Sequence, residues 1–205
     1  MRLRSVRRMA WLGVAIVGAL TAATGGGWLV TDGPLAPAIV TGPASLAIGG
    51  PFRLTDHRGQ AVSEADFRGQ PMAVFFGFTH CPDICPTALG DMTALIERLG
   101  SRADEIAWLF ISVDPARDTP EELTRYLDAF DPRIRGLTGT EAQVAEAAQS
   151  FRIAYRRIPQ DGGTYTMDHS SSIFLLDRSG RFAGSLDRHE NDAIRLAKLL
   201  PLLPQ

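Results

Sequence analysis

The hydrophobic positions of this chain fall into short apolar runs separated by segments with helical spacing. Residues 72–76 and 106–113 form two such runs, and we interpret both as buried strands. Thr119-Pro120 and Thr140-Glu141 are typical of helix starts. A further helix is predicted between the two strands, from apolar side chains that recur at helical spacing: Leu89, Met92, Leu95, Ile96 and Leu99.

The remaining pattern completes an α/β domain. Two hairpins are predicted, one near its start (52–54 with 60–62) and one near its end (172–176 with 181–186). Residues 192–202 predict an amphipathic helix at the C-terminus. Strands that are separated by helices and end in a hairpin indicate an α/β sandwich, with a mixed central sheet flanked by helices.

The first 31 residues follow a different pattern. Four arginines at positions 2–8 precede residues 9–31, in which no side chain is charged. That length is sufficient for a transmembrane helix, and the arginines are expected to stay in the cytoplasm. A cleaved signal peptide is the alternative. The small residues at 21–24 are a poor cleavage site, however, and the apolar character continues beyond them.

We therefore predict a signal anchor at residues 1–31, a tether at 32–50 and an exported domain at 51–205. The protein would sit in the inner (cytoplasmic) membrane with its domain on the periplasmic side. Of the 21 basic residues four lie in the leader, so the rest of the chain has 17 against 23 acidic residues, a net charge near −6. Nucleic-acid binding calls for a basic face, so no nucleic-acid partner is expected.

The only two cysteines, Cys81 and Cys85, lie between the strand at 72–76 and the helix that follows it. Their spacing is one helical turn, so a helix would bring the sulfur atoms onto the same side, with Cys81 or Cys85 near its N-terminus. A position near a helix N-terminus favours the thiolate, which is the nucleophile and the metal ligand. A structural disulfide is the alternative, but it would close too small a loop to stabilise the domain much.

His169 is a third candidate, in a predicted loop at 165–172 that precedes the last hairpin. Such a loop can lie beside the helix after the cysteines, in which case His169 completes a Cys2His site. A loop histidine bonded only to backbone is the alternative. Two thiolates and an imidazole suit copper, and zinc with a bound water is a weaker possibility. His57, His80 and His189 are not expected to be ligands.

Acidic residues near these candidates have more than one interpretation. Asp168 either orients the ring of His169 or caps a turn through its own backbone. Residues 114–118 (Asp-Pro-Ala-Arg-Asp) are interpreted as shaping the turn that starts the next helix, because such residues are the usual turn and cap residues.

Three motifs resemble the Sco/SenC family: Cys-Pro-Asp-Ile-Cys-Pro at 81–86, Ser-Val-Asp-Pro-Ala-Arg-Asp-Thr-Pro at 112–120, and Asp-His-Ser at 168–170. They occur in the family's order, and the similarity covers about residues 45–203. The position of the cysteine pair after the first strand is also similar to a thioredoxin-like fold. The thioredoxin motif, however, has two intervening residues and this chain has three.

The resemblance implies a membrane-anchored, thioredoxin-like protein that binds Cu(I) or Cu(II) through Cys81, Cys85 and His169. Such proteins assist copper-centre assembly in cytochrome c oxidase, so the expected partner is its copper-binding subunit. A thioredoxin-like reductant and another copper chaperone are further possible partners. The first hypothesis is therefore a copper metallochaperone, which is not an enzyme. The second is a thiol-disulfide oxidoreductase that uses both cysteines to reduce the apo-oxidase.

Overall fold

The computed structural model describes residues 48–204. The predicted anchor at 1–31 and most of the predicted tether lie outside the described residues, so both stay predictions. Within residues 48–204, no helix combines the length and the hydrophobicity that crossing a bilayer requires.

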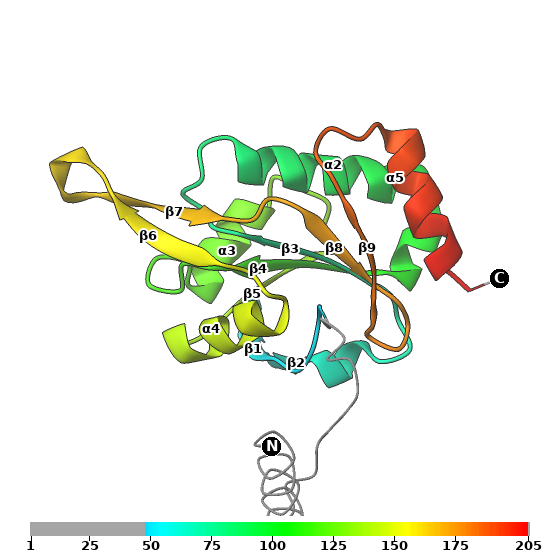
Figure 1. The fold of residues 1–205 in the computed structure, drawn as a ribbon, viewed down its shortest axis with the longest axis horizontal. Coiled ribbons are helices and arrows are strands. Elements are labelled where there is room, and N and C mark those ends of the chain that lie inside the picture. The colour runs from blue at the N-terminus through cyan, green and yellow to red at the C-terminus, as the bar shows by residue number, and fades with distance from the viewer. Residues whose placement is uncertain (1–47, 205) are drawn as a thin grey trace, which may run out of the picture. The chain divides into compact units, whose positions relative to one another are not determined.

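A seven-stranded mixed sheet forms the centre of the fold, in the order β2-β1-β5-β4-β3-β8-β9 (Figure 1). The three central strands β5, β4 and β3 run parallel, and the outer strands join them antiparallel. The predicted mixed sheet and both predicted hairpins are confirmed. The strands are β1 (Arg53–Asp56), β2 (Ala61–Ser63), β3 (Met72–Gly77), β4 (Ala107–Ser112), β5 (Ile134–Thr138), β8 (Ile173–Leu176) and β9 (Phe182–Leu186).

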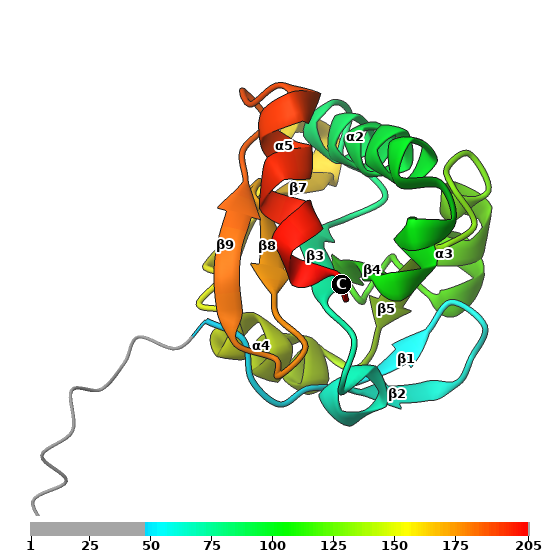
Figure 2. The ribbon, with the colours of Figure 1, turned by 90° about the vertical axis from the view of Figure 1, so that its right-hand side faces the viewer.

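Helices cover both faces of this sheet, as the sequence predicts. Helices α2 and α5 lie together on one face and α4 lies on the other (Figure 2). Helices α3 and α4 each begin after a threonine, Thr119 or Thr140, whose hydroxyl accepts a backbone N–H three residues later. The α-helices are α2 (Ile84–Leu99), α3 (Pro120–Leu127), α4 (Glu141–Ser150) and α5 (Asp192–Leu199), and short 3₁₀ turns occupy Glu64–Phe67, Gly100–Glu105, Asp161–Gly163 and Leu200–Leu202.

The C-terminal helix is shorter than predicted. The α-helix α5 ends at Leu199, and the chain continues as a 3₁₀ turn over Leu200–Leu202. Leu200 still has helical backbone angles, but Pro201 has no backbone N–H to continue the i→i−4 bonding of the α-helix, which accounts for the early end.

The core lies around the two central strands. Every residue of β3 and of β4 is buried. Their largest side chains, among them Phe75, Phe76, Trp108 and Phe110, are at most 1% exposed. Packing of this density leaves little room for movement. The turn that follows β3 therefore starts from a rigid support.

Strands β6 (Tyr155–Pro159) and β7 (Tyr165–His169) form a separate two-stranded antiparallel sheet. The sequence analysis predicted a loop over residues 165–172, and this is wrong for 165–169. Each residue of β6 is exposed or half-buried, so the strand lacks the alternation of apolar and polar residues by which a half-buried strand is recognised. In Figure 1 this hairpin extends away from the seven-stranded sheet.

Candidate metal centre

The two cysteines lie where the chain leaves β3 and enters α2. Cys81 belongs to the turn and is half-buried, whereas Cys85 is in the first turn of α2 and is fully buried. The backbone N–H of Cys85 lies 3.4 Å from Sγ of Cys81 and donates to it. Only Cys85 is helical, because α2 begins at Ile84, but the two residues still contact each other. Both side chains are free thiols.

A glycine at the end of β3 makes room for the Cys85 sulfur. A β-carbon on Gly77 would lie 2.9 Å from Sγ of Cys85 and 2.7 Å from a ring carbon of Phe110. Side-chain atoms do not approach so closely without displacement of a neighbour. The position of Cys85 therefore depends on the absence of a side chain at residue 77.

His169 is the last residue of β7, and its ring faces the cysteines. Its Nε2 lies 3.8 Å from Sγ of Cys85. Its Nδ1 lies 2.7 Å from the carbonyl oxygen of Ser170. A carbonyl can only accept, so the hydrogen of the neutral ring is on Nδ1 and the lone pair of Nε2 points toward the sulfur. The ring also contacts Phe75 and Phe78 edge-on, with centroids 6.2 and 5.8 Å away.

The two thiols differ in acidity. A hydrogen bond from Cys85 lowers the pKa of Cys81 against the opposing effect of burial, and the backbone N–H groups of Cys85 and Asp83 lower it further. The same hydrogen bond, together with burial, raises the pKa of the Cys85 thiol. Without a metal, Cys81 is thus the thiolate and Cys85 the thiol. Metal ligation would require both thiolates and would release the Cys85 proton.

The spacing of these donors suits a metal, although the site is not fully assembled. Among residues 48–204, no three His, Cys, Asp or Glu side chains are gathered closely enough to hold an ion. Metal–sulfur and metal–nitrogen bonds of roughly 2.3 and 2.0 Å place two ligands about 3.5–3.8 Å apart. Cys85 Sγ and His169 Nε2, 3.8 Å apart, already have that separation. The Cys81 sulfur, which accepts the backbone N–H of Cys85, lies beside them as the third donor.

The other histidines contact different parts of the protein. The Nδ1 atom of His80 lies 4.0 Å from a carboxylate oxygen of Asp118. His57 accepts a backbone N–H of β5 on its Nδ1 atom, at 3.0 Å. His189 accepts a hydrogen bond from the neighbouring arginine, also outside the cysteine turn. Their expected exclusion from the ligand set stays a prediction.

Asp168 has neither of the roles considered from the sequence. Its Oδ2 accepts a hydrogen bond from Nε of Arg156, at 3.1 Å, and the two residues are paired across the hairpin. Both side chains are mostly exposed. The carbonyl of Ser170, rather than Asp168, holds the ring of His169.

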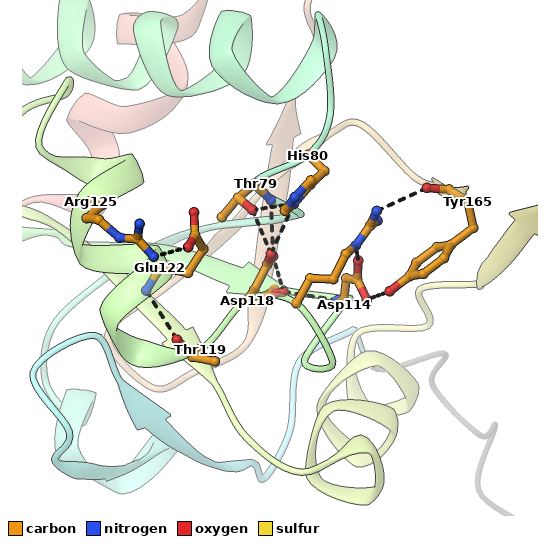
Figure 3. A network of polar contacts seen from close by, with 10 residues as sticks. Thr79, His80, Asp114, Asp118, Thr119, Glu122, Arg125 and Tyr165 are labelled. Atoms are coloured by element: carbon orange, nitrogen blue, oxygen red, sulfur yellow. Dashed lines mark hydrogen bonds and ion pairs between the residues drawn. The ribbon is translucent and has the colours of Figure 1, made fainter. Parts of the chain in front are cut away.

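A polar network connects the cysteine turn with the hairpin (Figure 3). Asp118 accepts the backbone N–H and the hydroxyl of Thr79, at 3.1 and 2.7 Å. Asp114 accepts the phenol O–H of Tyr165 at 2.9 Å. Both aspartates are buried, and burial raises the pKa of Asp118. The sequence analysis assigned residues 114–118 to a turn alone. Their position directly after a fully buried strand was the available signal, because loops at such strand ends often carry function.

Comparison with known proteins identifies the family. Residues 41–203 match the family described as SCO1/SenC. The SCO2-like protein RP587 of Rickettsia prowazekii is 42% identical over 139 residues, which are 67% of this chain and 68% of that protein. The mitochondrial SCO2 homolog of Homo sapiens is 46% identical over 136 residues, 65% of this chain and 51% of the relative. This chain thus spans about half the length of its human relative.

Solved structures show the same fold. The structure of Bradyrhizobium japonicum ScoI with copper bound has 43% sequence identity to this chain and a TM-score of 0.73. The match covers 77% of this chain and 100% of the ScoI chain. BsSco, described as a member of the Sco family of cytochrome c oxidase assembly proteins in which a disulfide switch was identified, has 25% identity and a TM-score of 0.59 over 75% of this chain and 93% of that one. On these matches, the chain belongs to the SCO1/SenC family.

Proposed function

We propose that this protein is a copper metallochaperone in which Cys81, Cys85 and His169 hold the ion. The observation that carries the proposal is the 3.8 Å approach of His169 Nε2 to Cys85 Sγ, across 84 positions of sequence. Thiolates favour Cu(I) and imidazole is a common ligand of copper, so this donor set suits the metal in either oxidation state. The copper-bound structure of the related ScoI supports the same choice of metal.

We propose cytochrome c oxidase as the client, through its copper-binding subunit, because a relative is described as one of its assembly proteins. Cys81 is half-buried and the neighbouring Ile84 is 37% exposed. A partner could therefore reach the sulfur and contact an apolar side chain beside it. A thioredoxin-like reductant and another copper chaperone are the further partners that such a cycle would use.

We also propose that residues 1–31 anchor the protein in the inner membrane, with its C-terminal domain in the periplasm. A periplasm-active reporter fused after Gln205 should then be active. A soluble product that starts near residue 25 would show instead that the segment is cleaved.

The ligand set can be tested by copper titration of the full-length protein in detergent, after its thiols have been reduced and the reductant has been removed. Changes to groups around metal ligands typically cost 10–100-fold in affinity, so loss of a ligand should cost about 100-fold or more. We expect that loss in Cys81→Ala, Cys85→Ala and His169→Ala. His80→Ala and His189→Ala are the matched controls and should bind copper within about threefold of wild type. A normal Cu(II) complex in His169→Ala would remove that residue from the site.

The second candidate function is thiol-disulfide exchange with the apo-oxidase. It is favoured by the unequal thiols, since the half-buried, low-pKa Cys81 could attack a client disulfide and the buried Cys85 could resolve the mixed disulfide. A Cys81–Cys85 disulfide would exclude copper, because ligation needs free thiolates. The disulfide switch described for BsSco fits such chemistry.

Complementation of a strain that lacks the gene separates the two functions. His169→Ala keeps both thiols, so it should fail to restore oxidase activity if copper delivery is the function. Rescue by His169→Ala, with failure of Cys81→Ala and Cys85→Ala, would instead identify the thiol reductase.

A further inference from the structure

We propose that Tyr165 clamps the β6–β7 hairpin onto the β4–α3 loop and thereby positions His169 against the two cysteines. The clamp consists of Tyr165, Asp114 and Arg117. This inference rests on the proposed copper function, since it uses the same three ligands. It assigns these residues to positioning, because none of them is itself a proposed ligand.

The need for a clamp follows from how the hairpin is connected. Strand β7 pairs with β6, and the two form a sheet separate from the seven-stranded one. The main sheet therefore does not fix the direction in which β7 points. His169 stands at the end of β7, so any swing of the hairpin would move its ring relative to Cys85.

Tyr165, four residues before His169, contacts the loop in three ways. Its phenol O–H donates to Oδ1 of Asp114 at 2.9 Å, as Figure 3 shows. Its backbone carbonyl accepts a hydrogen bond from a terminal nitrogen of Arg117 at 3.1 Å. Its ring lies under the guanidinium of Arg117, with 3.8 Å between the central carbon and the ring centroid. Attraction between a cation and an aromatic face stabilises this arrangement.

Two further contacts make the clamp rigid. The guanidinium carbon of Arg157 lies 4.1 Å from the same ring centroid. The ring of Tyr165 thus contacts a guanidinium of its own hairpin, Arg157, and one of the loop, Arg117. Arg117 also donates from Nε to Oδ2 of Asp114. The phenol and the guanidinium therefore bind the two oxygens of one buried carboxylate.

The loop that receives Tyr165 also holds the cysteine turn. Ser112 accepts the backbone N–H of Asp114 at 3.0 Å and donates to Oδ2 of Asp118 at 2.6 Å. Asp118 in turn accepts both the N–H and the hydroxyl of Thr79, two residues before Cys81. A continuous chain of hydrogen bonds thus runs from the strand of His169 to the turn of the cysteines. The β4–α3 loop sets the distance between them.

Tyr165 does not hold the hairpin alone, and this limits the expected effect. Met167 of β7 is 9% exposed and packs into the core. The His169 ring itself packs on Phe75 and Phe78. Loss of the phenol O–H should therefore make the hairpin more mobile and weaken copper binding, without unfolding the hairpin or the site.

The test compares Tyr165→Phe with Tyr155→Phe in the full-length protein. Tyr165→Phe removes only the phenol oxygen and keeps the ring in contact with the two arginines. Tyr155 is the other hairpin tyrosine, and burial, followed by the nearby charge of Glu141 in α4, raises the pKa of its phenol. It is therefore a matched control on the opposite strand. Arg117→Lys is a second variant, because lysine keeps the charge but loses the guanidinium fork.

One measurement is made without copper and two are made with copper. Hydrogen exchange of the copper-free protein should show the amides of β6 and β7 exchanging about tenfold faster in Tyr165→Phe and Arg117→Lys, while those of β3 and β4 are unchanged. Cu(II) titration should show about tenfold weaker binding, equivalent to about 1.4 kcal/mol. The nitrogen hyperfine coupling in the electron paramagnetic resonance spectrum should change as well. Tyr155→Phe should match wild type within about twofold throughout.

Unchanged hairpin exchange in Tyr165→Phe would overturn the clamp. Faster exchange with copper affinity and spectrum equal to those of Tyr155→Phe would overturn its role in positioning His169. Failure of the wild-type protein to bind copper would reject the proposed function instead, and the exchange comparison would still decide whether Tyr165 holds the hairpin.

Discussion

The turn that carries the cysteines and the hairpin that carries the histidine are built differently, although their side chains meet. The turn leaves β3, a strand paired on both sides and buried along its whole length. The hairpin pairs only within itself, and all residues of β6 are exposed or half-buried. Cys85 is fully buried, whereas His169 is half-buried at a strand end.

This contrast separates stability from ligand geometry. The sulfur of Cys85 is held by the packing that also holds the domain together, so it should move only when the domain unfolds. The imidazole of His169 is held by a few contacts at the end of a less integrated element. Elements of this kind open locally at a lower free-energy cost than the core. The copper site is therefore expected to lose its histidine before it loses its cysteine pair.

The largest expected difference between the two regions is in the free energy of unfolding. Phe76 of β3 is fully buried and packs on Phe151, so Phe76→Ala should cost about 3–5 kcal/mol. Ile158 of β6 is half-buried, and Ile158→Ala should cost less than about 1 kcal/mol. Urea unfolding followed by circular dichroism measures both values. Losses of equal size would show that the hairpin belongs to the cooperative core.

The elements that local signals predict are the ones that the structure confirms. The buried runs of β3 and β4 are continuous, and the starts of α3 and α4 have capping threonines whose bonds form within one turn. Strand β5 was not predicted. It contains Gly136, where a β-carbon would lie 2.6 Å from a methyl carbon of Leu127. The close contact favours a glycine at this position, and a glycine interrupts the apolar pattern by which a strand is recognised.

The candidate site, too, could be predicted only as far as local signals in the sequence reach. Cys81, Cys85 and His169 could be selected from the sequence as candidate copper ligands, but a structural disulfide and a loop histidine remained as alternatives until the family resemblance was considered. Their spatial relation depends on the contact between His169 and Cys85, which lie 84 positions apart in the sequence, so no local signal predicts it. Residues 114–118 were interpreted as a turn, because the sequence shows that Asp114 is an aspartate but does not show that it is buried.

A smaller effect is expected at the glycine that admits the Cys85 sulfur. Gly77→Ala would place a methyl carbon 2.9 Å from Sγ of Cys85 and 2.7 Å from Phe110, so it should cost about 1–3 kcal/mol through overpacking. Gly90→Ala in α2 is the matched control. Beyond its chain neighbours and the backbone of α2, its β-carbon would meet no atom within 4 Å, so the higher helix propensity of alanine should stabilise by about 0.5–1 kcal/mol. Urea unfolding of both variants measures the difference, and a neutral Gly77→Ala would show that the turn can move.

The two thiols should also differ in reactivity. Cys81 is half-buried, and its pKa is lowered so far that it is a thiolate even at pH values well below neutral. Cys85 is buried, and the pKa of its thiol is raised. In the reduced, copper-free protein, iodoacetamide should label Cys81 at least about tenfold faster than Cys85. An ordinary thiol reacts about 100-fold more slowly at pH 6 than at pH 8, but Cys81 should keep most of its rate. Peptide mass spectrometry measures both, and equal labelling would contradict the asymmetry.

The smallest effect is expected at the ion pair on the outer side of the hairpin. Arg156 and Asp168 lie 3.1 Å apart, but their side chains are 73% and 59% exposed. Exposed pairs of this kind contribute about 0.2–1 kcal/mol and are weakened by salt. Arg156→Ala should therefore change the free energy of unfolding by less than about 1 kcal/mol. The difference from wild type should shrink further in 1 M salt, as urea unfolding at two ionic strengths would show. A large, salt-independent loss would mean that the hairpin is held through this exposed pair, and the contrast with the cysteine turn would then need a different explanation.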